Sequence, residues 1–179
     1  YEANFHEKPV GDITKIDEKE IPDFDLLFAG FPCQAFSIYK IKKGFEDNTK
    51  GTLFFDIARI IKEKQPYAFV LENVKNLVSH DGGKTLKTIL HTLREELGYH
   101  TEYKVLNALD FGLPQKRERI ILVGAKKTFC MDWKFEIQCV KTLKDILEDP
   151  VDRKHYVSEE IAKRRKEMHT AKTAPEIWH

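Results

Sequence analysis

The sequence predicts an open α/β domain built on a doubly wound, mostly parallel sheet, and two observations support this. Apolar runs of strand length recur along residues 1–127, and segments with helical apolar spacing stand between them. Such alternation is typical of strands joined by helical crossovers, with helices on both faces of the sheet. With 179 residues, 41% of them hydrophobic, the chain can bury one core of domain size.

The expected elements follow one another in a regular order. They are strand 25–29, helix 54–64, strand 67–71, helix 84–97, strand 101–106 and strand 120–123. Gln65-Pro66 should stop the first helix, because proline disfavours helical backbone in the residue before it. Gly98 should close the second as its C′ residue. Beyond residue 127 the alternation fades, and residues 140–165 indicate two short polar helices.

The charge and cysteine content exclude several classes of protein. Thirty Lys and Arg against 29 Asp and Glu give a net charge of +1, so any surface for nucleic acid must be local. The cysteine count of three is odd, and the sequence shows neither a signal peptide nor an apolar run of membrane-spanning length. We therefore expect a cytoplasmic protein of a reducing compartment, without a membrane partner.

The turn after the first predicted strand carries Pro32, Cys33 and Gln34. Ligands of doubly wound sheets bind at the carboxyl ends of strands, so a thiol in this turn could act as a nucleophile. A buried structural cysteine is the alternative for a lone thiol. Cys130 and Cys139 follow no strand end and are expected to be structural, and no cysteine spacing fits a zinc site.

Charged side chains flank two further strands at this edge. Glu72 follows the strand 67–71, and its carboxylate could carry a proton there. A glutamate that accepts backbone hydrogen bonds at a helix N-terminus is the competing interpretation. Arg117 and Arg119 precede the last strand, on one face of an extended segment. Alone, such a basic run is typical of a charge-paired surface.

Five motifs of residues 1–126 occur together: Gly11-Asp12-Ile13, Gly30-Phe31-Pro32-Cys33-Gln34-Ala35-Phe36-Ser37, Gly51-Thr52-Leu53, Glu72-Asn73-Val74 and Pro114-Gln115-Lys116-Arg117-Glu118-Arg119. Their combination resembles the cytosine C5 methyltransferase family of DNA-modifying enzymes, and especially its bacterial restriction-modification branch. Residues 140–165 resemble the stretch that leads into the target-recognition region of that family. The resemblance implies a Rossmann-like fold that depends on S-adenosylmethionine.

The resemblance implies a catalytic role for four residues. Cys33 would attack C6 of cytosine, Glu72 would hydrogen-bond or protonate N3, and Arg119 would donate to O2. Arg117 would fix the catalytic loop and compensate the charge of Glu72 or of a phosphate. Because the reaction cannot occur inside a stacked duplex, the base must be flipped out of double-stranded DNA, the expected partner.

The same resemblance assigns residues to the cofactor and to DNA. Asp12 would bind the adenine amino group of S-adenosylmethionine, and Leu53 with the backbone of Phe31 and Pro32 would line the pocket. A turn-forming residue after a glycine is the alternative for Asp12. The predicted substrate contacts are Gln34, Ser37 and Asn73. Ser37 and nearby lysines could bind phosphates from a closing loop, or belong to an ordinary solvated loop, and Asn73 should tie its loop to the Pro32-Cys33 turn.

Some segments of that family have no counterpart in the sequence. The glycine-rich cofactor loop would precede residue 1, and the recognition region would follow residue 179. We therefore expect a fold incomplete at both ends, from a fragment or from one partner of a split enzyme that is inactive alone. Residues 1–127 would be the middle part of the catalytic domain, and 128–179 an extension toward the recognition region.

Two other functions are compatible with the sequence. A tRNA cytosine C5 methyltransferase uses the same core, although its relatives usually carry a second proline where this chain has Phe31. A non-catalytic DNA-binding or regulatory subunit of a split methyltransferase would keep the fold. The presence of all four catalytic residues disfavours that second alternative.

Overall fold

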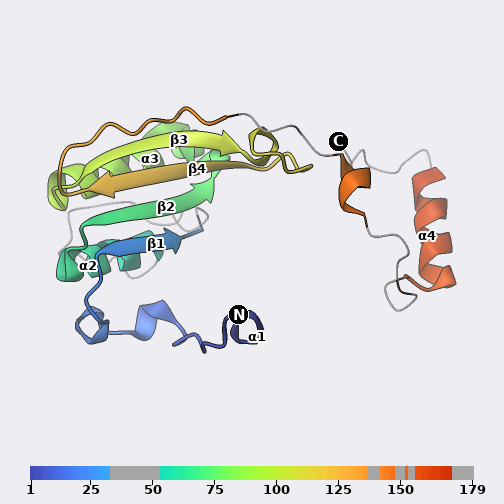
Figure 1. Cartoon of the computed structure of the whole chain (residues 1–179), viewed down its shortest axis with the longest axis horizontal. Helices are drawn as coiled ribbons and strands as arrows, with labels where there is room; N and C mark the ends of the chain where they lie inside the picture. The colour runs from blue at the N-terminus through green and yellow to red at the C-terminus, as the bar shows by residue number, and fades with distance from the viewer. Residues whose placement is uncertain (33–52, 137–141, 148–151, 153–155, 171–179) are drawn as a thin grey trace. The chain divides into compact units, whose positions relative to one another are not determined.

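The computed structural model describes residues 1–32, 53–136, 142–147, 152 and 156–170. The chain divides into two units, Tyr1–Val140 and Lys141–His179. In the first unit, four strands form one sheet in the order β1-β2-β4-β3 (Figure 1). Their bounds are β1 Leu26–Gly30, β2 Ala68–Val74, β3 His100–Asn107 and β4 Glu118–Ala125.

The sheet is mixed, which corrects the prediction of a mostly parallel one. β1 pairs in parallel with β2, whereas β4 pairs antiparallel with both β2 and β3. The α/β class is confirmed, but one of the three pairings in the described sheet is parallel. The reason is the connection from β3 to β4, a short loop with a single 3₁₀ turn, Ala108–Asp110, where a parallel pair would need a long crossover.

Two helices pack on one face of the sheet. They are α2 (Leu53–Lys64) and α3 (Lys84–His91), the latter continued by a π-helical turn, Thr92–Glu96 (Figure 1). Both helices end where the sequence predicts. Gln65, which precedes Pro66, has φ 49°, and Gly98 has φ 75°, so neither residue has helical backbone. The core lies between these helices and the sheet and contains Phe54, Ile57, Ala58, Ile61, Phe69, Leu71, Leu86, Ile89, Ile120 and Leu122.

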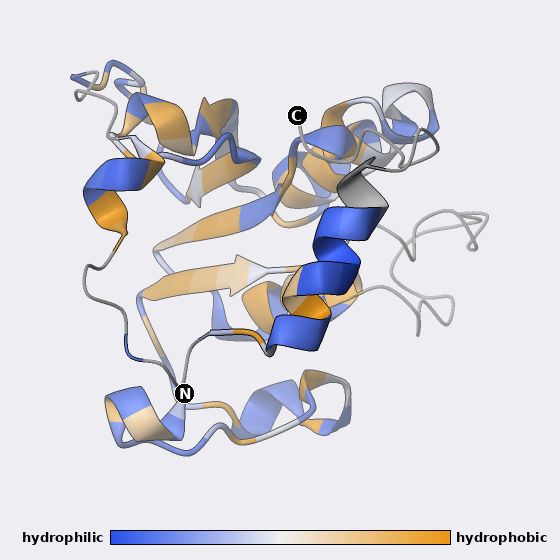
Figure 2. Cartoon of the chain, turned by 90° about the vertical axis from the view of Figure 1, so that its right-hand side faces the viewer, coloured by the Kyte–Doolittle hydropathy of each residue, from blue (hydrophilic) through white to orange (hydrophobic). Residues whose placement is uncertain are grey.

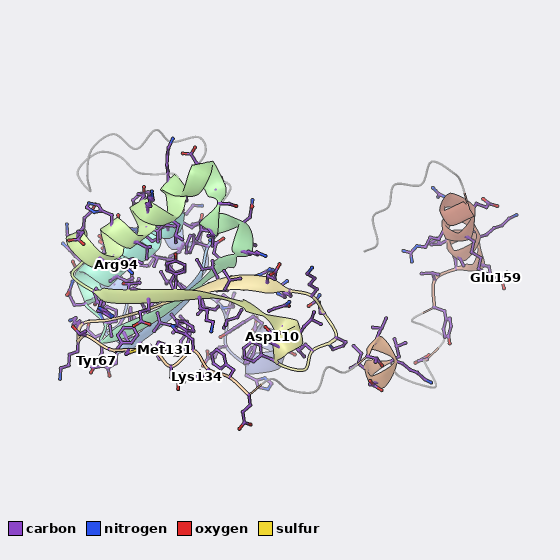
Figure 3. The ribbon with its side chains drawn as sticks, turned by 90° about the horizontal axis from the view of Figure 1, so that it is seen from above. Tyr67, Arg94, Asp110, Met131, Lys134 and Glu159 are labelled. Atoms are coloured by element: carbon purple, nitrogen blue, oxygen red, sulfur yellow. The ribbon has the colours of Figure 1, made fainter. Side chains whose placement is uncertain are left out.

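The sequence predicts helices on both faces of the sheet, and the face opposite α2 and α3 differs from this prediction. Within the described part of this unit, an extended segment, residues 126–136, lies there in place of a helix. Trp133 Nε1 donates a hydrogen bond to Glu102 Oε2 at 3.2 Å. Figure 3 shows Met131 on this side of the sheet and Arg94 on the helical side. Covering both faces would need helical crossovers on both sides, and the β3–β4 loop provides none.

The second unit contains a 3₁₀ turn, Leu143–Ile146, and α4, Glu159–Thr170. Asp145 Oδ2 accepts hydrogen bonds from Thr142 N and Oγ1, each at 2.7 Å, which forms a capping box. α4 is largely hydrophilic, as Figure 2 shows. In the part of the chain that the structure describes, every helix is too short or too polar to cross a bilayer.

Gly124 should not tolerate a side chain, because the ring of Phe69 fills the space beside it. A β-carbon on Gly124 would lie 2.0 Å from Cζ of Phe69, its partner in the β2–β4 register. Gly124→Ala should lower the free energy of unfolding by about 1–3 kcal/mol in urea denaturation, the usual cost of overpacking. In a Phe69→Leu background the same change should cost much less. An undiminished cost there would show that another contact is responsible.

Candidate active site

The predicted ligand edge forms where β1, β2 and β3 end and β4 begins, at the right of the sheet in Figure 1. The register pairs Gly30 with Glu72 and Val74 with Arg119. β4 runs against its neighbours, so its first residues lie beside the last residues of β2 and β3. Strand pairing therefore brings three segments that are distant in sequence to one edge.

Glu72 and Arg119 form an ion pair at this edge. Arg119 Nε lies 2.7 Å from Glu72 Oε1, the distance of a charge-assisted hydrogen bond. Arg119 Nη1 also donates to the backbone oxygen of Glu118 at 2.9 Å, which orients the guanidinium. The side chains of Glu72 and Arg119 are 44% and 24% exposed, so a ligand could reach both from solvent.

Gly30 leaves room for the second carboxylate oxygen of Glu72. A β-carbon at Gly30 would lie 3.4 Å from Glu72 Oε2, at the short limit of ordinary van der Waals contact. One oxygen of Glu72 is thus engaged by Arg119, and the other faces the strand end that leads into Phe31 and Pro32. The pair can present a carboxyl group and a guanidinium to neighbouring atoms of one ligand.

Asn73 points to the opposite side of β2 and is 2% exposed. Its Nδ2 donates to the backbone oxygen of Phe31 at 2.6 Å, and its Oδ1 accepts from Val74 N at 2.8 Å. Phe31 is itself buried, with its ring centroid 5.5 Å from that of Phe54. Asn73 therefore holds the backbone just before Pro32 against the end of β2. A contact of Asn73 with DNA stays a prediction.

Cys33, Gln34 and Ser37 lie outside the described residues, and their roles stay predictions. Pro32 is the last described residue before them, and it is exposed next to the buried Phe31. The described chain that leads to the predicted nucleophile thus lies at the same edge as Glu72. Among the described residues, no cluster of His, Cys, Asp and Glu is suited to hold a metal ion.

Arg117 lies in the loop that joins β3 to β4. Asn107 Oδ1 accepts hydrogen bonds from the backbone nitrogens of Leu109 at 3.3 Å and Arg117 at 3.2 Å. Ala108 N donates to Arg117 O at 3.0 Å, so both ends of the loop are fixed at the edge. The Arg117 side chain is exposed, and its catalytic role stays a prediction.

A second ion pair, which the sequence pattern does not reveal, lies beside the Glu72–Arg119 pair. Lys75 Nζ lies 2.8 Å from Glu118 Oε1, which links the residue after β2 to the first residue of β4. The hydrogen bond from Lys75 lowers the pKa of Glu118, so this carboxylate stays ionised at neutral pH. Opposite charges at the ends of neighbouring strands are the signal for such a pair, but only the strand order shows that β2 and β4 are neighbours.

The predicted cofactor residues lie on a turn and at a helix start. Asp12 Oδ1 accepts from Thr14 N at 3.1 Å and from Thr14 Oγ1 at 2.8 Å, and these bonds to Thr14 lower the pKa of Asp12. Asp12 is therefore a turn-forming residue, yet its carboxylate remains exposed, with Oδ2 3.7 Å from Lys15 Nζ. Leu53 begins α2 and packs half-buried against the core. An exposed acceptor and an apolar wall are groups that fit the adenosyl part of S-adenosylmethionine.

Fold and geometry together define an α/β protein whose ligand edge presents a paired carboxylate and guanidinium, a combination suited to a polar heterocycle. The chain belongs to the C-5 cytosine-specific DNA methylase family, because the model of that family matches residues 1–178.

Curated relatives agree with this family. The chain is 50% identical to the type II methyltransferase M.NgoBI of Neisseria gonorrhoeae over 182 aligned residues, which cover 100% of the chain and 57% of that protein. It is 62% identical to M.HhaI of Haemophilus parahaemolyticus over 123 residues, 69% of the chain and 37% of the relative. The matched part of the chain therefore spans 57% of the length of the first relative and 37% of the length of the second.

Solved structures support the fold alone. A DNMT2 mutant from Spodoptera frugiperda aligns with a TM-score of 0.64 over 93% of this chain and 53% of its own, at 18% identity. The methyltransferase EhMeth of Entamoeba histolytica aligns with a TM-score of 0.62, also at 18% identity.

Asn73 should contribute to stability through its buried bond to Phe31. Asn73→Ala leaves the Phe31 oxygen without its side-chain donor, so we expect a loss of about 1–3 kcal/mol in the free energy of unfolding. Asn76→Ala is the control: Asn76 is exposed nearby, and its loss should cost less than about 0.5 kcal/mol. Equal effects of the two substitutions would show that the bond to Phe31 contributes nothing specific.

Proposed function

We propose that this chain is the catalytic core of a DNA (cytosine-5)-methyltransferase of a type II restriction-modification system. It would act on a cytosine flipped out of double-stranded DNA, with S-adenosylmethionine as methyl donor. The observation that carries the proposal is the Glu72–Arg119 pair, 2.7 Å apart at the ligand edge. The family match and the type II methyltransferases among the relatives support it.

The geometry of the pair suits the pyrimidine edge of cytosine, where N3 and O2 belong to neighbouring ring positions. Glu72 would hydrogen-bond or protonate N3 through the oxygen that Arg119 leaves unused. Arg119 would donate to O2 at the same time, because its guanidinium lies beside that carboxyl group. Both contacts stabilise the electron density that moves to N3 and O2 when C6 is attacked.

The nucleophile in this proposal is the thiolate of Cys33. C5 of cytosine is a poor nucleophile, and formation of a sulfur–C6 bond makes C5 enamine-like. When bound, S-adenosylmethionine supplies the methyl group that C5 takes up. Loss of the C5 proton and departure of the Cys33 thiolate then restore the ring. Asn73 would help here by holding the backbone before Pro32, two residues from the thiol.

On the cofactor side, we infer a contact of Asp12 with the adenine amino group and walls formed by Leu53 and the backbone of Phe31 and Pro32. The finer fold would then be a doubly wound, Rossmann-like methyltransferase domain. Residues 1–127 would form its middle part, and residues 128–179 would lead toward a target-recognition region. That region or a complementary chain would read the DNA sequence, and the bacterial sources of the named relatives suggest the bacterial cytoplasm.

The full protein that carries these residues should form a covalent adduct with duplex DNA in which 5-fluorocytosine replaces cytosine. Fluorine at C5 leaves no proton to remove, so the adduct persists after methyl transfer. It should resist denaturant and map to Cys33 by mass spectrometry, and Cys33→Ser should form none. An adduct on Cys130 or Cys139, or methyl transfer to N4 of cytosine or N6 of adenine, would contradict the proposal.

Glu72→Gln should slow methyl transfer in that protein by about 10²–10⁴-fold, because glutamine keeps a hydrogen bond but supplies no proton. The dissociation constant for DNA should barely change. Single-turnover rates with labelled methyl donor measure the first effect, and gel-shift titration the second. Glu118→Gln is a matched control, since Glu118 lies at the same edge but pairs with Lys75. A comparable loss of rate in both variants would mean that Glu72 is not the specific acid.

A further inference from the structure

Arg59 of α2 makes four hydrogen bonds to residues of two separate segments. Its Nε donates to Asp56 Oδ1 at 3.0 Å, within the same helix. Its Nη1 donates to Ile16 O at 2.9 Å and to the carboxylate of Glu18, and its Nη2 donates to Ile13 O at 2.7 Å. One planar guanidinium thus clamps two backbone carbonyls and two carboxylates, and its side chain is 24% exposed.

The clamped segment consists of two 3₁₀ turns, Ile13–Lys15 and Glu18–Glu20, and neither turn contains a buried residue. Hydrogen bonds and ion pairs must therefore contribute a large part of the free energy that holds this segment on α2. Lys64 supplies a second anchor further along, since its Nζ donates to Lys19 O at 3.3 Å. Of these two anchors, Arg59 is the nearer to Asp12. Its Nη2 binds the carbonyl of Ile13, the residue that follows Asp12 in the chain.

We propose that Arg59 is a positioning residue for S-adenosylmethionine binding, which it supports by holding the turn of Asp12 against α2. The proposal rests on the proposed function. α2 begins at Leu53, so the clamp joins the helix that presents the apolar wall to the turn that presents the adenine acceptor. In this proposal Arg59 does not contact S-adenosylmethionine itself and acts through Asp12.

The guanidinium of Arg59 stays charged, and its planar shape makes this role specific to arginine at this position. Partial burial by itself would lower the pKa of Arg59, but the hydrogen bonds to Asp56 and Glu18 outweigh it and raise the pKa, so the group stays charged. A lysine carries a single ammonium on a flexible stem and cannot bind both carbonyls and both carboxylates in one plane. Arg59→Lys should therefore keep the positive charge and lose most of the hydrogen bonds that the guanidinium makes.

Calorimetric titration of the full protein with S-adenosylmethionine tests the link to Asp12. Arg59→Met should raise the dissociation constant about tenfold, which corresponds to about 1.4 kcal/mol. Asp12→Ala should also weaken binding, and the double variant should be no weaker than Asp12→Ala alone, because both act through one contact. Arg94→Met is the matched control: Arg94 Nε also donates to a backbone carbonyl, that of Thr101 at 3.2 Å, far along the chain from Asp12. Its dissociation constant should match that of the wild type.

Hydrogen exchange of the same proteins without ligand tests the clamp itself. The amides of Thr14, Lys15 and Ile16 bond within the first turn and should exchange at least several-fold faster in Arg59→Met. Arg59→Lys provides the same comparison if Arg59→Met does not fold. Unchanged exchange overturns the positioning role, and additive losses in the double variant overturn the link to Asp12. Failure of the wild-type protein to bind S-adenosylmethionine would instead overturn the proposed function, and the inference with it.

Discussion

The antiparallel position of β4 between β2 and β3 is the constraint on which the candidate active site depends. Because β4 runs against both neighbours, Arg119 at its start pairs with Val74 at the end of β2. A parallel β4 of the same length would carry Arg119 to the other edge of the sheet, roughly 20–25 Å away at about 3.3 Å per residue. The short β3–β4 loop imposes this direction, and the ion pair of Arg119 with Glu72 is its consequence.

Side chains of β2 alternate between the two faces of the sheet. Residues that stabilise the core therefore lie on one face of the strand, and the accessible carboxylate lies on the other. Phe69, Leu71 and Asn73 face the helices and are buried, whereas Glu72 faces the other way and remains accessible. Asn73 links the two functions, since a buried side chain fixes the backbone that leads into the exposed Pro32. The described part of the site is thus attached to the buried core, which favours precise placement of its groups.

The proposed cofactor side is held by different interactions from the proposed catalytic side. Strand register and core packing hold Glu72, Arg119 and Asn73, whereas the turn of Asp12 has no buried residue and depends on the guanidinium of Arg59. Hydrogen bonds between charged groups at a partly exposed surface respond to salt and to single substitutions more than a packed core does. Substitutions on the two proposed sides should therefore act independently of each other.

The sequence by itself determined the approximate positions of α2, of the helical segment after Lys84 and of the four strands, where those two helices end, and which family the motifs indicate. These features depend on local chemistry: apolar periodicity, the restriction that Pro66 imposes on Gln65, and the positive φ of Gly98. The same local reasoning accounts for the carboxylate near the end of β2, for Arg117 just before β4 and for Arg119, the second residue of β4. The predicted roles of Cys33, Gln34 and Ser37 come from the resemblance, since these residues lie outside the described part of the chain.

Only the tertiary structure decided the direction of β4, the one-sided helical cover, the Glu72–Arg119 and Lys75–Glu118 pairs and the Arg59 clamp. A buried strand shows the same apolar run whether it pairs parallel or antiparallel, so direction cannot be inferred from its pattern. The ion pairs and the bonds from Arg59 to Ile13, Ile16 and Glu18 join residues more than forty positions apart, as for Arg59 and Ile13 with a separation of 46. Charge alone does not select such partners, because many lysines, arginines and carboxylates compete for them. The folded sheet selects them by placing their backbones side by side.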